Sequence, residues 1–263
     1  MRIPIYQLDA FASRIFSGNP AAVMLLDEDL PDQTLQSLAV ENNLSETAFL
    51  VKQANDYRLR WFTPACEVPL CGHATLASGA VVLERLERSR EEVVFYTASG
   101  ELRVRRAGEG YAMDFPANPA GRIAIPARSK AGLGVEPKEA LRNSRFTVLV
   151  LKNAAEVAEL TPGMQALAEL DPHGVIVTAA GDGGFDFVSR FFAPRLGVPE
   201  DPVTGSAHCV LTPYWSERLG KTEFRAYQAS RRGGELVCRL KKDRVELEGK
   251  CAFYMEGTVR MEN

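Results

Sequence analysis

The 263-residue sequence lacks a long hydrophobic run. Near the N-terminus the longest purely apolar stretch is residues 21–26, far short of the roughly 20 residues that a membrane-spanning helix needs. It follows Asp9, Arg14 and Asn19 rather than the basic start of a secretory leader. We therefore expect neither a signal peptide nor a membrane anchor.

An excess of charge of one sign is also missing. The chain has 31 basic and 34 acidic residues, a net charge of −3 and a pI near 5.8. Such a balance creates no global field that attracts phosphate polymers or anionic lipids, so no nucleic-acid or membrane partner is expected. With 46% hydrophobic and 25% charged residues, the composition excludes disorder, collagen and coiled coil.

The five cysteines do not form the pattern of a disulfide framework or of a zinc site. They are odd in number and widely scattered, which favours reduced thiols and a cytoplasmic protein. The spacing of Cys66, Cys71 and His73, and the adjacent His208 and Cys209, match no standard zinc pattern. No nucleotide-binding glycine motif occurs either, so we expect no metal and no nucleotide cofactor.

Short runs of branched and aromatic residues dominate the first half and predict strands. These seven runs are residues 3–8, 21–26, 47–51, 58–62, 93–97, 102–106 and 111–115. Helical spacing predicts a surface helix over 31–42. A second helix begins at Gly72, and its small, uncharged residues on every side predict that strands enclose it. Prolines and a glycine make residues 115–129 the best linker.

The second half repeats this order of elements. It predicts strands at 146–151, 175–178 and 185–192, a helix at 205–219, and then four more strands. At an offset of 130, residues 60–69 match residues 190–199 at five of ten positions, against about one in fifteen by chance. After a three-residue insertion that contains Asp201, Gly72-His73-Ala74 falls on Gly205-Ser206-Ala207. We interpret this as a duplication.

The duplication predicts an α+β fold of two similar domains, each a mixed β-sheet or barrel around a central helix, related by a pseudo-twofold axis. We place the domains at residues 1–118 and 119–263, with the last strand able to pair with the first domain. The cleft between two such halves is the expected site. Two helix N-termini meeting there would hold a carboxylate, so the expected ligand is a small organic acid.

Three residues are candidates for chemistry, and each has a purely structural alternative. Glu46, at the start of an apolar strand, is partly withdrawn from water as a general acid/base requires, or is a solvent-facing strand-end charge. His73 opens the first central helix, where a neutral imidazole could relay a proton, or it is a capping residue. Asp201 could bind an ammonium or hydroxyl group or fix His73, or it favours the helix dipole.

Two more side chains beside these candidates have weaker support. Cys71 precedes Gly72 and could be a thiol nucleophile paired with His73, although adjacent residues at a helix start point in different directions. His208 lies inside the second central helix, where a core histidine with satisfied hydrogen bonds is expected.

Several motifs together resemble the phenazine-biosynthesis PhzF-like family, and the resemblance covers nearly the whole chain. The motifs are Leu8-Asp9-Ala10-Phe11, Ser17-Gly18-Asn19-Pro20-Ala21-Ala22-Val23, Leu44-Ser45-Glu46-Thr47-Ala48-Phe49, Phe62-Thr63-Pro64, Cys71-Gly72-His73-Ala74-Thr75-Leu76-Ala77, Glu200-Asp201-Pro202-Val203-Thr204-Gly205-Ser206-Ala207-His208 and Ser230-Arg231-Arg232-Gly233-Gly234. The resemblance implies the diaminopimelate-epimerase-like fold.

The same resemblance implies an activity and a set of site residues. The family's phenazine enzyme is a cofactor-free isomerase in which a glutamate moves a proton within a dihydro-hydroxyanthranilate, and Glu46 occupies that position here. Its histidine, aspartate and serine carry over to His73, Asp201 and Ser206. We expect Ser45, Gly72, Gly205 and Ser206 to bind the substrate, no cofactor, and a homodimer.

Two other kinds of function stay open. Racemases and epimerases of the wider fold use two facing cysteines, and the corresponding residues here are Cys71 and Thr204. One thiol and one hydroxyl cannot supply two thiol bases, so a single-carboxylate isomerase is favoured over a racemase or a thiol-dependent enzyme. The third possibility is a non-catalytic protein that binds a small acid.

Overall fold

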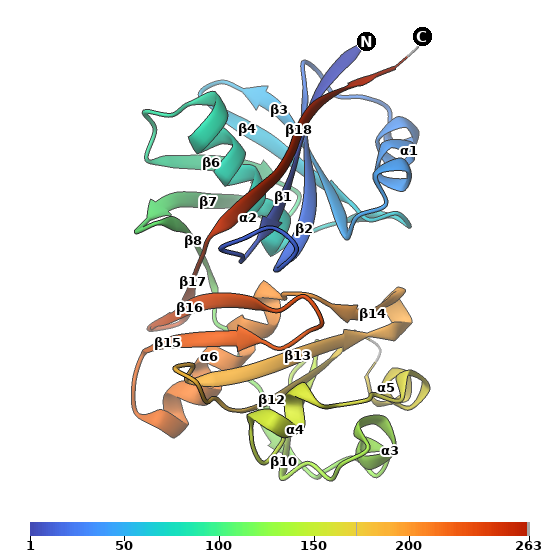
Figure 1. Cartoon of the computed structure of the whole chain (residues 1–263), viewed down its shortest axis with the longest axis vertical. Helices are drawn as coiled ribbons and strands as arrows, with labels where there is room; N and C mark the ends of the chain where they lie inside the picture. Colours follow the sequence, from blue (N-terminus) through green and yellow to red (C-terminus); the bar gives the residue numbers. More distant parts are fainter. Residues whose placement is uncertain (172, 262–263) are drawn as a thin grey trace. The chain divides into compact units, whose positions relative to one another are not determined.

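The computed structural model describes residues 1–171 and 173–261, and strands account for most of its regular structure (Figure 1). The chain folds into two compact units, residues 1–114 with 248–263, and residues 115–247. None of the helices in these described residues is long and apolar enough to cross a membrane. All five cysteines are free.

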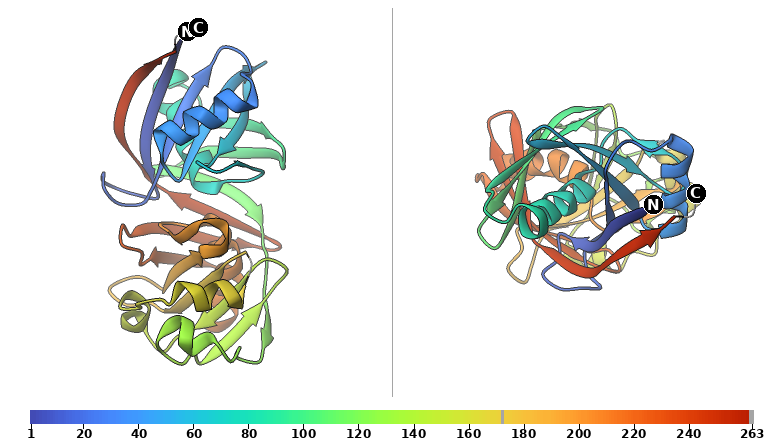
Figure 2. Two further views of the ribbon diagram at one scale, coloured as in Figure 1. Left: turned by 90° about the vertical axis from the view of Figure 1, so that its right-hand side faces the viewer. Right: turned by 90° about the horizontal axis from the view of Figure 1, so that it is seen from above.

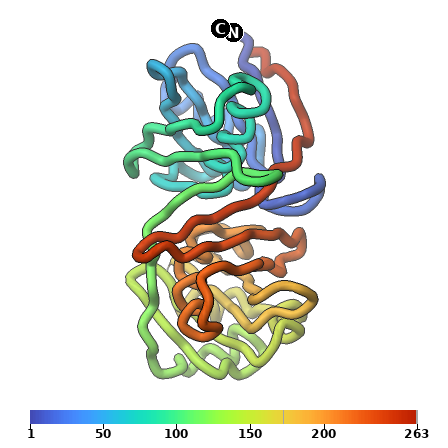
Figure 3. Tube along the Cα trace, turned by 90° about the vertical axis from the view of Figure 1, so that its left-hand side faces the viewer, coloured from blue at the N-terminus to red at the C-terminus, as the bar shows by residue number. Residues whose placement is uncertain are grey.

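The first unit is a curved mixed sheet. Its strands are β1 (Arg2–Ala10), β2 (Asn19–Leu26), β3 (Glu46–Gln53), β4 (Asp56–Phe62), β5 (Glu67–Val68), β6 (Glu92–Thr97), β7 (Gly100–Ala107), β8 (Gly110–Pro116) and β18 (Cys251–Arg260). Paired strands follow the order β18-β1-β2-β3-β4-β6-β7-β8, with only the pairs β2–β3 and β4–β6 parallel. Because β18 pairs with β1, the two ends of the described chain run side by side (Figures 2 and 3).

The second unit has the same order of strands. They are β9 (Gly121–Ile123), β10 (Glu139–Arg142), β11 (Thr147–Val150), β12 (Val175–Ala180), β13 (Phe187–Ala193), β14 (Val198–Asp201), β15 (Glu223–Gln228), β16 (Gly234–Lys241) and β17 (Arg244–Gly249). The order is β9-β10-β11-β12-β13-β15-β16, and the parallel pairs are β11–β12 and β13–β15. These parallel pairs occupy the places of β2–β3 and β4–β6, which supports the duplication.

The helices also follow the repeat. The first unit has α1 (Asp32–Asn42), α2 (Gly72–Val81) and a π-helical turn η1 (Val82–Leu86). The second has α3 (Ser129–Leu133), α4 (Ala154–Ala158), α5 (Met164–Leu170), the 3₁₀ turn η2 (Pro194–Leu196) and α6 (Gly205–Leu219). The expected central helices are therefore confirmed as α2 and α6, each preceding the strand that pairs in parallel.

Strands enclose α2, as its composition predicts. Every residue from His73 to Val81 is buried, and the helix packs against β1, β2, β3, β7 and β18. The packing is closest at Gly79, where a Cβ atom would lie 2.3 Å from Cγ1 of Val104 on β7. A larger residue would force the helix away from β7, so Gly79 sets the depth of α2 in the unit.

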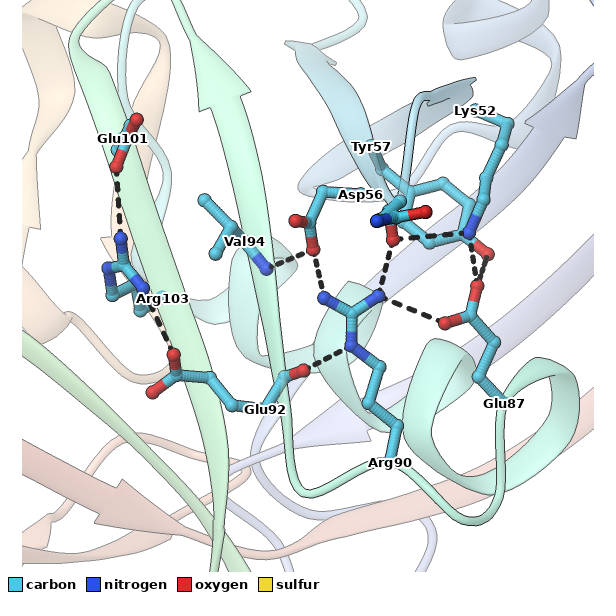
Figure 4. Close-up of polar contacts among 10 residues, drawn as sticks. Lys52, Asp56, Tyr57, Glu87, Arg90, Glu92, Val94, Glu101 and Arg103 are labelled. Atoms are coloured by element: carbon cyan, nitrogen blue, oxygen red, sulfur yellow. Dashed lines mark hydrogen bonds and ion pairs between the residues drawn. The ribbon is translucent and has the colours of Figure 1, made fainter.

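A network of charged groups fixes the chain after the end of α2 (Figure 4). Glu87 pairs with Lys52 and with Arg90, and it accepts a hydrogen bond of 2.8 Å from the hydroxyl of Tyr57. Arg90 also pairs with Asp56 at the start of β4. These contacts tie the C-terminal end of the α2–η1 segment to β3 and β4.

The structure corrects the position of the insertion between the repeats. Trp61 pairs with Val68 on β5, whereas Phe191, 130 residues further on, pairs with Asp201 on β14. The equivalent of Asp201 is therefore Val68, and the extra residues lie earlier, around the turn η2. The matched identities at Val198 and Pro199 were coincidental.

Matching ion pairs in the two repeats agree with this alignment. Nε of Arg60 donates to Glu67 at 2.7 Å, and Nε of Arg190 donates to Glu200 at 2.7 Å. In both pairs the second guanidinium nitrogen binds the other carboxylate oxygen. Each bidentate pair bridges the two strands that lead to a central helix, so both repeats orient that helix in the same way.

Candidate active site

Glu46 is the first residue of β3, immediately after the turn that ends α1. Asn43 ends α1 in the left-handed conformation, with φ of 47°, and Ser45 is half-buried before the strand begins. Glu46 pairs in the parallel ladder with Ala21 of β2, and its side chain is 17% exposed. The carboxylate is therefore mostly enclosed but open on one side.

His73 lies at the start of α2 and faces this carboxylate. Its side chain is 5% exposed, and its Nε2 lies 2.9 Å from Oε2 of Glu46. On the other side of the ring, Nδ1 lies 3.1 Å from the amide nitrogen of Asn19. If the ring is neutral and Nδ1 accepts from Asn19, the proton is on Nε2; if the ring is charged, both nitrogens are protonated. Nε2 therefore carries a proton next to Glu46 in either form.

The charge of His73 differs from the expectation of a neutral imidazole. Burial alone would lower its pKa, but negative charge at Cys71 and Glu46 raises the pKa well above the usual value for histidine. The neutral form was predicted from the helix N-terminus. The raised pKa favours the charged ring instead, because a carboxylate that the sequence does not reveal lies within ion-pair distance of it.

Cys71 also touches His73, contrary to the prediction that their side chains diverge. Its Sγ lies 3.5 Å from Nδ1 and 4.0 Å from Nε2 of the ring. Cys71 is the N-cap of α2 with extended backbone (φ −141°, ψ 114°), so the directions of helical side chains do not apply to it. Burial, together with the charge of Glu46, raises the pKa of this thiol. The raised pKa favours the thiol form of Cys71 over the thiolate.

In the second unit, Asp201 lies at the end of β14 and contacts the N-cap of α6. Oγ1 of Thr204 donates to Oδ2 of Asp201 at 2.5 Å. Thr204 is extended, as Cys71 is, and Gly205 and Ser206 form the first turn of α6. Ser206 is half-buried, whereas Gly205 is buried.

Gln228 holds this loop in place, and no pattern in the sequence indicated it. Its amide oxygen accepts from the backbone N–H of Thr204 at 2.8 Å. Its amide nitrogen donates to the carbonyl of Asp201 at 2.7 Å and to Oγ1 of Thr204 at 3.2 Å. Gln228 is fully buried at the end of β15, so one side chain fixes both ends of the 201–204 loop.

His208 is a buried residue of α6, as expected, but its hydrogen bonding is incomplete. Nδ1 lies 2.8 Å from the carbonyl of Thr204, whereas Nε2 is buried with no hydrogen-bond partner in the described part of the chain. Burial lowers the pKa of His208 to about 4, so the ring is neutral at physiological pH.

The sequence-predicted site residues therefore form two groups, one in each unit. Glu46 and His73 are in direct contact, with Ser45 and Gly72 next to them in the chain. Asp201 lies three residues before Thr204, to which it is bonded, and Gly205 and Ser206 follow directly.

Two residues that complete these groups were not predicted. Asn19 lies 54 residues from His73 in the sequence, and Gln228 lies 24 residues from Thr204. Neither belongs to a spacing that indicates a site. Asn19 does lie in residues 17–23, one of the motifs on which the family resemblance rests. That motif is the sequence signal from which Asn19 could have been identified.

Comparison with known proteins identifies close relatives over the full length. Residues 8–257 match the family described as phenazine biosynthesis-like protein. An uncharacterized isomerase of Pseudomonas aeruginosa is 49% identical over 261 residues, covering 99% of this chain and 100% of that protein. The crystal structure of a PhzF-family phenazine biosynthesis protein from Enterococcus faecalis is 47% identical, with a TM-score of 0.96 over 99% of this chain and 100% of that one.

The fold is shared with more distant proteins. The crystal structure of a hydroxyproline epimerase from Agrobacterium vitis superposes with a TM-score of 0.62, covering 98% of this chain and 92% of that one at 9% identity. This likeness concerns the fold alone. Together with the close structural relative, it confirms the epimerase-like α+β fold that the sequence predicted.

Proposed function

Because this chain belongs to the phenazine biosynthesis-like protein family, in which a full-length relative is named an isomerase, we propose that it is an isomerase that moves a proton within a small carboxylic acid. Glu46 is the group that accepts the proton from one carbon of the substrate and returns it to another. The reaction needs no cofactor, because one carboxylate can perform both steps.

The observation that carries this proposal is the contact between Glu46 and His73. A general acid/base must be reachable by substrate yet shielded from bulk water, and the Glu46 side chain is 17% exposed. The His73 ring, held by Asn19 on its other side, places Nε2 at 2.9 Å from Oε2 of the carboxylate. This contact fixes the orientation of Glu46 and keeps one carboxylate oxygen available to the substrate.

The starts of the two central helices provide sites for the substrate carboxylate. The first N–H groups of a helix have no partner within the helix and carry the positive end of its dipole. Gly72 opens α2 and Gly205, followed by Ser206, opens α6. In the first unit we assign a substrate carboxylate to the N–H groups at Gly72, with Ser45 beside Glu46 as a further contact. In the second unit, the N–H groups at Gly205 and the hydroxyl of Ser206 are a separate candidate site for a carboxylate.

Asp201 is assigned to a polar substituent of the substrate. Its Oδ2 accepts from Thr204, and Gln228 fixes the backbone on which it lies. A carboxylate held in this way can accept a hydrogen bond from a substrate ammonium or hydroxyl group.

The two alternatives make different demands on the same residues. A thiol-dependent enzyme or racemase would use Cys71, whose raised pKa disfavours the reactive thiolate. A non-catalytic protein would bind an acid without exchanging its carbon-bound hydrogens. The five free cysteines are compatible with a cytoplasmic location. We retain the homodimer as the expected assembly, and light scattering would measure it.

The test is an incubation in D₂O with a dihydro-hydroxyanthranilate and with a panel of small amino and hydroxy acids, followed by NMR. We expect a rearranged product or deuterium at a carbon position for at least one acid, and neither with Glu46→Gln. An acid that binds tightly but gains no deuterium and does not rearrange would establish the binding protein instead. Inactivation by alkylation of Cys71 would favour the thiol enzyme.

A further inference from the structure

Glu46, Cys71 and His73 present three different metal-binding atoms to a common point. One carboxylate oxygen, one sulfur and one imidazole nitrogen all lie within 4.8 Å of one another. Cys71 and His73 are buried, whereas Glu46 is open on one side. We propose that this triad binds Zn²⁺, and that the bound ion inhibits the protein.

The distances are close to those of a zinc site. Tetrahedral Zn²⁺ with ordinary bond lengths sets nitrogen, oxygen and sulfur ligands roughly 3.3 to 3.6 Å apart. Here Nε2 of His73 lies 2.9 Å from Glu46 Oε2 and 4.0 Å from Cys71 Sγ. Zinc on Nε2 therefore requires the carboxylate to move away from the ring by about half an ångström. It also requires the sulfur, which lies 3.5 Å from Nδ1 and 4.0 Å from Nε2, to turn toward the Nε2 side of the ring.

The neighbour on the other side of the ring selects the nitrogen that binds. Nδ1 of His73 faces the amide of Asn19 at 3.1 Å, which leaves Nε2 for the metal. A histidine ligand in proteins usually has such a partner on its second nitrogen, which fixes the ring and raises its basicity. Turning the Asn19 amide presents its oxygen to a protonated Nδ1, as a ring bound through Nε2 requires.

Three protein ligands leave the fourth zinc position to water on the open side of Glu46. Zinc takes thiolate and unprotonated nitrogen, so binding to the protonated His73 ring releases the Cys71 thiol proton and the Nε2 proton to solvent and leaves Nδ1 protonated. Both Glu46 and His73 are then held by the ion. The inhibition, unlike the binding, rests on the proposed function, since it removes the carboxylate that moves the proton.

Cobalt(II) is the probe that reads the ligands directly. The untagged, metal-free chain is titrated with Co²⁺ and followed by absorption spectroscopy. We expect one Co²⁺ per chain, with visible d–d bands of a four-coordinate ion and a near-ultraviolet thiolate-to-cobalt charge-transfer band. Zn²⁺ added afterwards should displace Co²⁺ and abolish both signals.

Matched variants assign the signals to the triad. Cys71→Ser, with Cys71→Ala as a second form, should lose the charge-transfer band. Cys66→Ser changes an exposed cysteine of the same loop region and should keep the band. Asn19→Ala should weaken Zn²⁺ binding by about 10 to 100-fold, the usual cost of losing the partner of a histidine ligand. Circular dichroism identifies any variant that fails to fold.

Several outcomes would overturn the site. These are no charge-transfer band in the wild type, a band that persists without Cys71, or a band lost equally in Cys66→Ser. A distinct result separates this inference from the proposed function. If Zn²⁺ bound with the thiolate signature but left substrate deuteration unchanged, the metal site would stand, and catalysis by Glu46 would be rejected.

Discussion

Nε2 of His73 lies 2.9 Å from Oε2 of Glu46, although the two residues are 27 positions apart and belong to a helix and a strand. The contact forms because α2 is buried against β3, with the start of the helix at the level of the first residue of the strand. It places a carboxylate against the His73 ring, and the first two predictions address this contact.

Glu46→Gln keeps the shape of the side chain and removes its titratable site. Turnover should fall by about 10² to 10⁴-fold, the usual contribution of general acid/base catalysis, while substrate affinity changes little. Cys71→Ser should reduce turnover less than about tenfold, because the proposed reaction uses no thiolate. Steady-state kinetics on the true substrate measures both. A fully active Glu46→Gln beside an inactive Cys71→Ser would reverse the assignment.

The raised pKa of His73 predicts how stability depends on pH. An unfolded histidine has a pKa of about 6.5, so above that pH the folded His73 keeps a proton that the unfolded chain has lost. This stabilisation is complete below about pH 6.5 and is lost as the pH rises through the folded pKa, by at most about 1.4 kcal/mol per pH unit.

Glu46→Gln should flatten this decline, because the variant lacks the carboxylate that opposes the effect of burial on the ring. Urea unfolding of both proteins between about pH 6.5 and 7.5 gives the comparison, in a range where free thiols are mostly protonated. NMR titration of the His73 ring provides an independent measurement. An equal slope in the two proteins would mean that Glu46 does not hold the proton on His73.

Gln228→Leu should destabilise the protein through the loop that carries Asp201. The backbone N–H of Thr204 and the carbonyl of Asp201 would both lose a partner, and each unsatisfied buried group costs about 1–3 kcal/mol. Gln228→Glu keeps an acceptor for Thr204 and should cost less. Urea unfolding measures the loss, and weaker binding of a substrate acid would show that Gln228 positions Asp201. Unchanged stability would mean that other contacts fix the loop.

Gly79→Ala tests the close packing of α2. Alanine is favoured over glycine in a helix by about 1 kcal/mol, but the added methyl group would overlap Val104, and overpacking costs about 1–3 kcal/mol. We expect a net loss of unfolding free energy. The double variant Gly79→Ala with Val104→Ala should show positive coupling in a double-mutant cycle. Additive effects of the two substitutions would mean that α2 shifts to accommodate the added methyl group without pressing on Val104.

Removal of metal should not impair the proposed reaction. Activity is expected to survive dialysis against EDTA, since Glu46 needs no ion to move a proton. A loss of activity that zinc restores would instead make the Glu46, Cys71 and His73 triad a catalytic metal centre.

The sequence predicts the elements with strong periodicity and misses the shortest ones. The seven strands of the first half, both central helices and the four final strands are confirmed. The short strands β5, β9, β10 and β14, of two to four residues, were not predicted. Over so few residues, the alternation of apolar and polar side chains that indicates a strand cannot be distinguished from the pattern of a loop. Such short strands form only because neighbouring strands pair with them.

The residues of the candidate site also differ in how far the sequence predicts them. Glu46 and His73 lie within local motifs, and the resemblance of those motifs to the family makes both residues candidates. Asn19 and Gln228 could not be predicted from spacing, because their partners come from distant segments that only the folded sheet brings together. The raised pKa of His73 could not be predicted for the same reason, since it depends in part on a neighbour in another element.

The pairing of β18 with β1 determines the order in which the protein can be completed during synthesis. The strands of the second unit, β9 to β17, follow one another in the sequence, whereas the first unit needs β18 (Cys251–Arg260), the last strand of the chain. As the chain leaves the ribosome, the later unit can close while the earlier one still has an exposed edge on β1. In most proteins the N-terminal part of the chain completes its folding first during synthesis. Here the nascent protein must shelter β1 until its final strand arrives, which makes that edge the exposed target for chaperones or for misassociation with another nascent chain.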